Sequence, residues 1–164
     1  MKKEVIEDLL HTIQVILNWV VFENELTYLC FSAMCKEIEL IEINADVMGR
    51  FIQEESHRKY EYNYFFFSQF AQSKPEESLD ILINFVHHEM THYYCFLKGI
   101  KNTDGLFHTE AFKEAIERFN GSCRYVNDVY GWTDSRLNPE ALETVKATLK
   151  YLNTNRINVK ETKA

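Results

Sequence analysis

The chain has 164 residues, of which 46% are hydrophobic and 26% are charged, and it carries a formal net charge of −7 at pH 7. This length and composition predict one globular domain over residues 1–164 and exclude a long disordered linker. The acidic balance argues against a protein that binds mainly nucleic-acid phosphates. We therefore expect weak nucleic-acid binding at most, at the basic segment 145–164.

The first predicted element is a helix over residues 4–22, where apolar side chains recur at steps of three and four residues. Three stretches rich in β-branched or alternating side chains then predict strands at residues 36–46, 50–55 and 59–67, the last ending near Ser68. Together they predict a small sheet of about three strands behind an N-terminal helix.

The second half of the chain is predicted to be mostly helical. A helix opens at Pro75 and continues to about Gly99, the segment 101–106 has the residues of a loop, and a further helix begins near Thr109. Residues 121–140 are predicted to be irregular or weakly extended. A last helix is predicted over residues 139–152.

The sequence also bears on the compartment. No stretch is long and apolar enough to cross a membrane, and charged residues interrupt the N-terminal run that a signal peptide needs. The four cysteines form no CxxC pair, which favours reduced thiols over a disulfide framework. We therefore expect a cytoplasmic protein with no membrane partner, and a monomer by default.

Residues 88–92 read HEMTH, an HExxH motif inside the predicted helix that opens at Pro75. Two residues four apart on a helix are offset by about 40°, so the imidazoles of His88 and His92 project from one face and can share one Zn²⁺ ion. Glu89 lies beside them, where its carboxylate can take a proton from water without being a metal ligand. His87 lies about 100° around the helix from His88, which favours a packing or supporting role.

A hydrolytic zinc site needs a third protein ligand, and spacing alone does not choose between His108 and Glu110. His108 precedes the helix whose Phe112 and Ile116 are predicted to face the core. Glu110 already has a role at the positive end of that helix dipole. Position therefore favours His108, with Glu110 as the alternative.

The segment HHEMTHYYCFLKGIKNTDGLFHTEAFKEAIERFNG resembles the SprT-like zinc metallopeptidase domain, whose pattern is HExxH, a loop of variable length, and His-x-x-x-Phe opening another helix. The matching residues are His88, Glu89, His92, His108 and Phe112. It is most similar to short proteins of bacteria, phages and mobile elements, in which HEMxHYY, GIxDT and YGW recur; here these read HEMTHYY, GIKNTDG and YGWTDS. The resemblance covers residues 20–135 and is most specific over 80–133.

This resemblance implies a zincin-like α+β domain with a metal-binding helix pair, in which His88, His92 and His108 hold one zinc ion and Glu89 is the general base. The implied function is hydrolysis of peptide bonds in a protein or peptide substrate. Two alternatives remain open: a protein of the same zinc fold that binds or regulates host proteins for a phage or mobile element, and a DNA-associated protease. The intact Glu89 argues against the first, and the lack of a four-cysteine zinc set argues against the second.

Two further sets of side chains are candidates for roles in hydrolysis. One set follows the helix pair and could stabilise an oxyanion. The other lies on the predicted strand 59–67 and could align an extended substrate by strand addition, with ordinary sheet packing as the alternative. The oxyanion candidates are Tyr130, Tyr125 and Arg124, and the substrate-strand candidates are Tyr60, Tyr62 and Tyr64.

Overall fold

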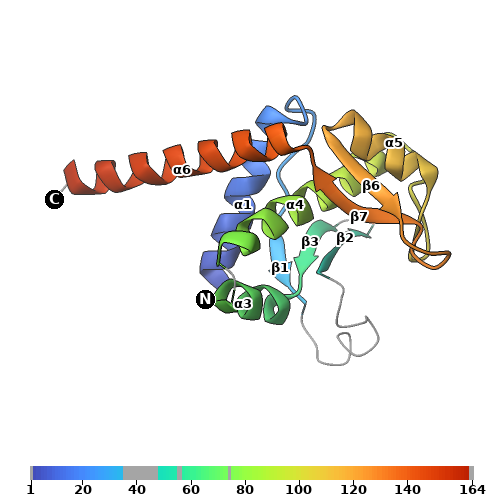
Figure 1. The fold of residues 1–164 in the computed structure, drawn as a ribbon, viewed down its shortest axis with the longest axis horizontal. Coiled ribbons are helices and arrows are strands. Elements are labelled where there is room, and N and C mark those ends of the chain that lie inside the picture. The colour runs from blue at the N-terminus through green and yellow to red at the C-terminus, as the bar shows by residue number, and fades with distance from the viewer. Residues whose placement is uncertain (1, 35–47, 55–56, 74, 163–164) are drawn as a thin grey trace.

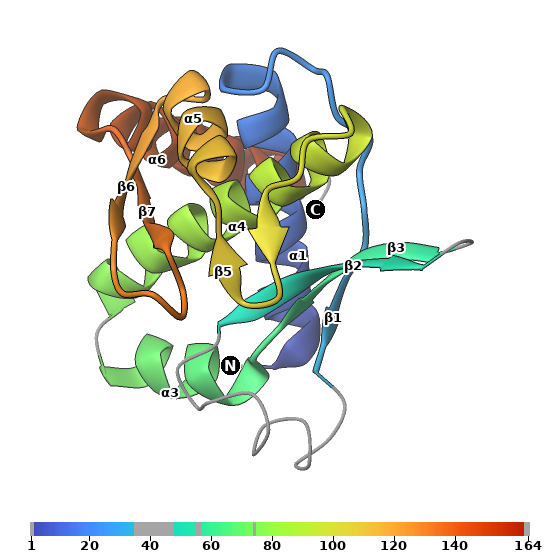
Figure 2. The same cartoon turned by 90° about the vertical axis from the view of Figure 1, so that its right-hand side faces the viewer.

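A computed structural model describes residues 2–34, 48–54, 57–73 and 75–162. At its centre lies helix α4 (Pro75–Leu97), which contacts α1, α3, α5, α6, β2 and β7 (Figures 1 and 2). Buried side chains lie on all sides of this helix, and those of Ile83, Val86 and Cys95 are completely shielded. A helix that is apolar all round belongs in the interior. The HExxH motif is therefore held in the core, and the helix predicted to open at Pro75 is confirmed.

Helix α1 (Lys3–Val20) packs along one side of α4 and confirms the helix predicted over residues 4–22. Its buried stripe runs from Ile6 to Leu17 at helical spacing. In the last turn of the helix, the Asn18 side chain forms hydrogen bonds with both the carbonyl and the N–H of Leu26. These two bonds satisfy buried polar groups where the chain turns back toward the sheet.

Helix α6 (Pro139–Thr162) packs against α1 through the buried side chains of Val145 and Leu149 and then extends away from the rest of the fold (Figure 1). It contains the helix predicted over residues 139–152 and is longer. Within the described residues, no helix combines the length and the apolar character that crossing a membrane requires.

The larger sheet has the strand order β1-β3-β2. The central strand β3 (His57–Tyr62) is parallel to β1 (Phe31–Ala33) and antiparallel to β2 (Gly49–Glu54). β2 confirms the strand predicted at residues 50–55. The strand predicted at residues 36–46 lies outside the described residues, and β1 is too short to produce a periodic pattern.

The prediction that the strand of residues 59–67 continues to Phe67 is wrong. The strand ends at Tyr62, and helix α3 (Tyr64–Ser73) begins two residues later. The Asn63 side chain accepts a hydrogen bond of 3.1 Å from the N–H of Phe66, as a helix N-cap does. This local capping outweighs the preference of the following aromatic residues for a strand.

The tyrosines proposed as a substrate strand are part of the protein's own packing. Tyr60 and Tyr62 are 0% exposed, and Tyr64 belongs to α3. β3 is paired with β1 on one edge and with β2 on the other, so it has no edge to offer to an added strand. The pairing therefore excludes strand addition at Tyr60, Tyr62 and Tyr64, and sheet packing accounts for the two buried rings.

Two hairpins follow α4 and flank helix α5 (Glu110–Arg118), which confirms the helix predicted near Thr109. Their strands are β4 (Thr103–Asp104) with β5 (Phe107–His108), and β6 (Gly121–Tyr125) with β7 (Trp132–Leu137). The first hairpin lies where the sequence predicted a loop. The second lies in the segment predicted to be irregular or weakly extended, because its polar strands show little alternation. The described residues thus form a mixed α+β fold of five helices and small sheets.

Candidate metal centre

Three histidines from two elements converge at one point of the fold. His88 and His92 lie one turn apart on α4, and His108 is the last residue of β5. One nitrogen from each of these imidazoles lies within 4.8 Å of the corresponding nitrogens of the other two. A half-buried group of three imidazoles with this spacing could bind a metal ion.

The other nitrogen of each ring is held by a hydrogen-bond partner. His88 Nδ1 lies 2.7 Å from Ser135 Oγ, His92 Nδ1 lies 2.5 Å from Asn102 Oδ1, and His108 Nδ1 lies 3.0 Å from the Tyr130 carbonyl oxygen. A carbonyl or amide oxygen can only accept, so Nδ1 of His92 and of His108 carries the proton, whereas Ser135 Oγ can accept from His88 Nδ1 or donate to it. The Nε2 atoms of His92 and His108 thus keep their lone pairs, and His88 offers a third when its proton is on Nδ1, which is the usual arrangement around ligating histidines.

The distance between the Nε2 atoms of His88 and His92 is close to that between two ligands of a tetrahedral ion. His88 Nε2 and His92 Nε2 lie 3.1 Å apart. Two ligand nitrogens about 2.05 Å from a tetrahedral zinc ion would be about 3.3 Å apart. Two lone pairs that face each other at this distance repel unless a cation or a proton lies between them. The donor set therefore fits a small divalent cation.

Burial keeps the three imidazoles neutral, which is the protonation state in which they bind metals. Burial, followed by the neighbouring histidines, lowers the pKa of His88 well below its usual value and that of His92 to about 3. Burial also lowers the pKa of His108. All three rings are therefore neutral near pH 7, as metal ligation requires.

Glu89 is a buried carboxyl group on the same helix and is only 4% exposed. Burial raises its pKa to about 8, and a hydrogen bond from the Phe51 backbone on β2 acts in the opposite direction. Its Oε2 has no hydrogen-bond partner among the described residues. One carboxylate oxygen atom is thus left without a protein partner, on the residue next to His88.

The Phe112 ring of α5 packs against all three histidines and is completely buried. Its centroid lies 4.5 Å from His92, in a stacked arrangement, 4.8 Å from His88 and 4.9 Å from His108. This contact explains why a His-x-x-x-Phe spacing suits the site: one turn of helix brings the ring back over the imidazole that precedes it.

The β6–β7 hairpin fixes the position of His108. The backbone N–H of His108 donates to the Tyr130 carbonyl oxygen at 2.8 Å, and the same oxygen accepts from His108 Nδ1. Gly131 has a φ of +65°, and a Cβ at this position would lie 2.3 Å from the His108 carbonyl oxygen. Only glycine permits this close approach. The YGW segment, residues 130–132, therefore fixes the position of the third histidine.

Of the two candidates for the third ligand, His108 belongs to the group of possible metal ligands found among the described residues and Glu110 does not. Glu110 is exposed in the first turn of α5. His87 points away from the site: its Nε2 donates to the Phe119 carbonyl oxygen at 2.7 Å, and its ring packs against Phe22. His87 therefore has a packing role.

The oxyanion candidates have other partners. Arg124 Nε donates to Asp134 Oδ2 at 2.6 Å, and the Tyr125 hydroxyl group donates to Asp128. Tyr130 contributes its carbonyl oxygen to His108. An oxyanion role for Tyr130, Tyr125 or Arg124 stays a prediction.

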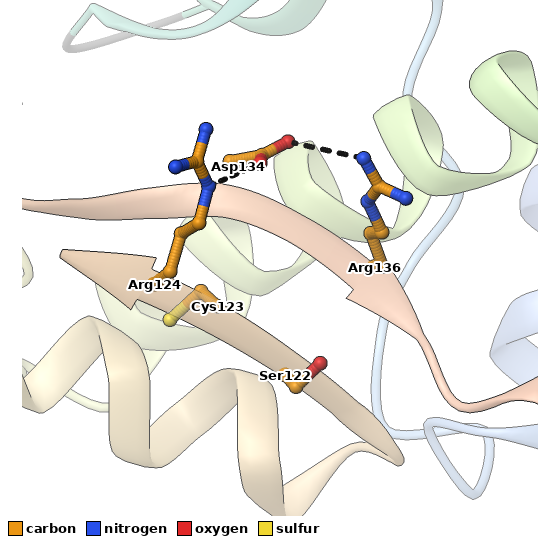
Figure 3. Close-up of a pocket in the computed structure, with 5 residues that line it drawn as sticks. All are labelled: Ser122, Cys123, Arg124, Asp134 and Arg136. Atoms are coloured by element: carbon orange, nitrogen blue, oxygen red, sulfur yellow. Dashed lines mark hydrogen bonds and ion pairs between the residues drawn. The ribbon is translucent and has the colours of Figure 1, made fainter. Parts of the chain in front are cut away.

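A shallow hollow of about 360 Å³ lies on the β6–β7 hairpin, where Asp134 sits between the guanidinium groups of Arg124 and Arg136 (Figure 3). The five residues that line the hollow include none of the three histidines and not Ser135, which contacts His88. The hollow is therefore separate from the metal centre.

Sequence reasoning missed Asn102 and Ser135 as supports of the site. Both lie inside strings that carried the family resemblance, GIKNTDG and YGWTDS, so a signal was present. The strings did not reveal which histidine each residue contacts, because those contacts depend on how two hairpins approach α4. The contact of the Phe51 backbone with Glu89 had no sequence signal, since any residue supplies a backbone N–H.

Comparison with family models, curated proteins and solved structures finds no match to the chain in any of the three. The geometry of the three histidines and Glu89 is therefore what supports a function for the site.

Proposed function

We propose that the chain is a zinc-dependent metallopeptidase of the SprT-like type. One observation carries the proposal: three imidazoles each offer a nitrogen within 4.8 Å of the other two, and Glu89, on the same helix as His88 and His92, keeps one carboxylate oxygen without a hydrogen-bond partner among the described residues. Three ligands leave a fourth position open, as in hydrolytic zinc sites. A purely structural zinc site usually closes all four positions.

The choice of zinc follows from the ligands and the chemistry. Imidazole nitrogens suit zinc, copper, iron and nickel. A zinc ion held by these residues would supply a Lewis acid without redox chemistry and bring the pKa of a water molecule to about 7. Asn102, Ser135 and the Tyr130 carbonyl oxygen orient the three rings toward that ion.

Glu89 supplies the proton transfers. Its pKa of about 8 belongs to a buried carboxyl group without a cation nearby. A divalent cation held by the neighbouring histidines would favour the charged carboxylate and lower this pKa, which would place Glu89 in the form of a base near neutral pH. The carboxylate takes a proton from the attacking water and delivers it to the leaving amine. The Phe51 backbone holds the carboxylate during this exchange.

The test combines metal content with cleavage. Purified protein is expected to contain one zinc ion per chain and to cut a labelled unfolded protein. Removal of the metal by a chelator is expected to abolish cleavage, and added zinc is expected to restore it. A zinc-loaded protein that cuts none of a broad set of peptides and unfolded proteins would contradict the proposal and favour a binding role.

A further inference from the structure

The two hairpin turns beside the metal centre expose bulky apolar side chains. Leu106, in the β4–β5 turn, is 63% exposed, and Val129, in the β6–β7 turn, is 57% exposed. Tyr125 and Val126 are exposed next to them. We call Leu106, Tyr125, Val126 and Val129 the apolar rim. Single exposed apolar residues are ordinary, but a group of four on two adjacent hairpins is not.

The apolar rim is continuous with the metal centre. His108 lies two residues after Leu106 of the first turn, and its backbone N–H donates a hydrogen bond to the carbonyl oxygen of Tyr130 in the second turn. The Phe107 ring lies 6.3 Å from the Tyr125 ring, which lies 5.6 Å from Trp132. Both turns lie side by side at the same end of the molecule (Figures 1 and 2). A chain bound at the three histidines would therefore pass the rim within a few residues, at about 3.3 Å per extended residue.

The second turn has a defined shape. The side-chain oxygen of Asn127 accepts hydrogen bonds of 2.9 Å from the N–H groups of both Val129 and Tyr130. The backbone carbonyl oxygen of Asn127 accepts a further one of 2.8 Å from the N–H of Gly131. The hydroxyl group of Tyr125 donates to Asp128. Val129 and Tyr125 are thus presented on an ordered turn, which lowers the entropy cost of binding a partner there.

The charges of the turns restrict the partner. Residues 104–106 and 126–130 contain Asp104 and Asp128 and no Lys or Arg, and the whole chain carries a net charge of −7. An acidic partner would be repelled at this surface, whereas a neutral or basic one would not.

We propose that the apolar rim binds bulky apolar side chains of an extended polypeptide without acidic residues and places that polypeptide over the metal centre. The inference rests on the proposed function, because it assigns a substrate class to the same site. Folded proteins bury their apolar side chains, so the substrate is an unfolded or locally unfolded chain.

The experiment measures binding without cleavage. Zinc-loaded Glu89→Gln protein is titrated into two short fluorescein-labelled peptides, one alternating Leu and Ser and one with Ser and Thr only. The Leu peptide is expected to bind about 10-fold more tightly, the gain from burying one apolar side chain. Adding Leu106→Ser and Val129→Ser together is expected to remove this preference and leave the affinity for the polar peptide unchanged.

The matched control is Val5→Ser, since Val5 is 53% exposed in the first turn of α1, away from both hairpins. It is expected to leave the preference intact, and Val129→Thr, which keeps the side-chain shape, is expected to reduce it. Equal binding of both peptides, or equal effects of the rim and control variants, would overturn the inference. A preference at the rim without cleavage by the wild type would contradict only the hydrolytic function. Equal cleavage of both peptides, unchanged by the rim variants, would contradict only the inference.

Discussion

His87 and His88 are neighbours on α4, yet their surroundings differ in a way that decides what each can do. Both rings are shielded enough for burial to lower their pKa values, to about 4 for His87 and well below the usual value for His88. His87 uses Nε2 to donate to the Phe119 carbonyl oxygen, whereas His88 uses Nδ1 to contact Ser135 and directs Nε2 at His92. A buried neutral histidine is therefore not by itself a ligand. The nitrogen that its partner leaves free decides the role.

The largest expected effect concerns the third histidine. His108→Ala removes one of three ligands, so the zinc affinity is expected to fall by orders of magnitude and cleavage to be lost. Glu110→Ala, two residues away on the exposed first turn of α5, is expected to leave zinc binding unchanged and cost little stability. Competition with a chromophoric chelator measures both affinities. The reverse ranking of the two variants would show that the glutamate is the ligand.

A substitution of His87, in contrast, is expected to lower stability and leave zinc binding intact. His87→Ala leaves a cavity beside Phe22 and an unpaired Phe119 carbonyl oxygen, so it is expected to lower the free energy of unfolding by about 3 kcal/mol. The folded fraction is expected to keep one zinc ion per chain. Urea unfolding and metal analysis check this prediction, and a variant of normal stability that has lost its zinc would contradict it.

The buried neutral state of His87 also predicts a pH dependence. Its pKa is lowered from 6.5 to about 4 in the folded protein, so the unfolded chain binds the proton more tightly. The free energy of unfolding is therefore highest above about pH 6.5, and His87 alone lowers it by about 3 kcal/mol as the pH drops to 4. His87→Gln, which keeps an N–H donor and does not titrate, is expected to make unfolding of the metal-free protein less sensitive to pH over this range. An unchanged pH dependence would contradict a buried neutral His87.

Smaller effects are expected from the residues that orient the ligands. Ser135→Ala leaves His88 Nδ1 without its hydrogen-bond partner and is expected to weaken zinc binding by about 10- to 100-fold, with the ligands themselves intact. Ser122→Ala is the matched control, because Ser122 is an exposed serine on the paired strand β6. Isothermal titration of the metal-free proteins with zinc separates the two variants. Equal affinities would show that Ser135 does not support His88.

The parts of the site that were predictable from the sequence are those with a local cause. The four-residue spacing of His88 and His92 places both rings on one face of any helix. His108 was favoured over Glu110 by its position before a helix. In each case the evidence lies within one turn or one loop of the residue concerned.

The parts that were not predictable depend on contacts between distant segments. Ser135 reaches His88 because β7 packs on α4, and Asn102 reaches His92 because the chain turns back after α4. The hairpin β6–β7 forms although its strands are polar, because its turn is closed by Asn127 and its Gly131 fits against His108. A single side-chain cap at Asn63 converted the end of a predicted strand into α3.

The central claim is that the three histidines hold the metal while Glu89 carries out the proton transfers without binding it. Glu89→Gln tests this claim most directly, because it keeps the shape of the side chain and removes its ability to accept a proton. We expect one zinc ion per chain in both proteins and a fall in kcat of at least about 10²-fold in the variant. Undiminished cleavage by Glu89→Gln at full zinc occupancy would contradict the account.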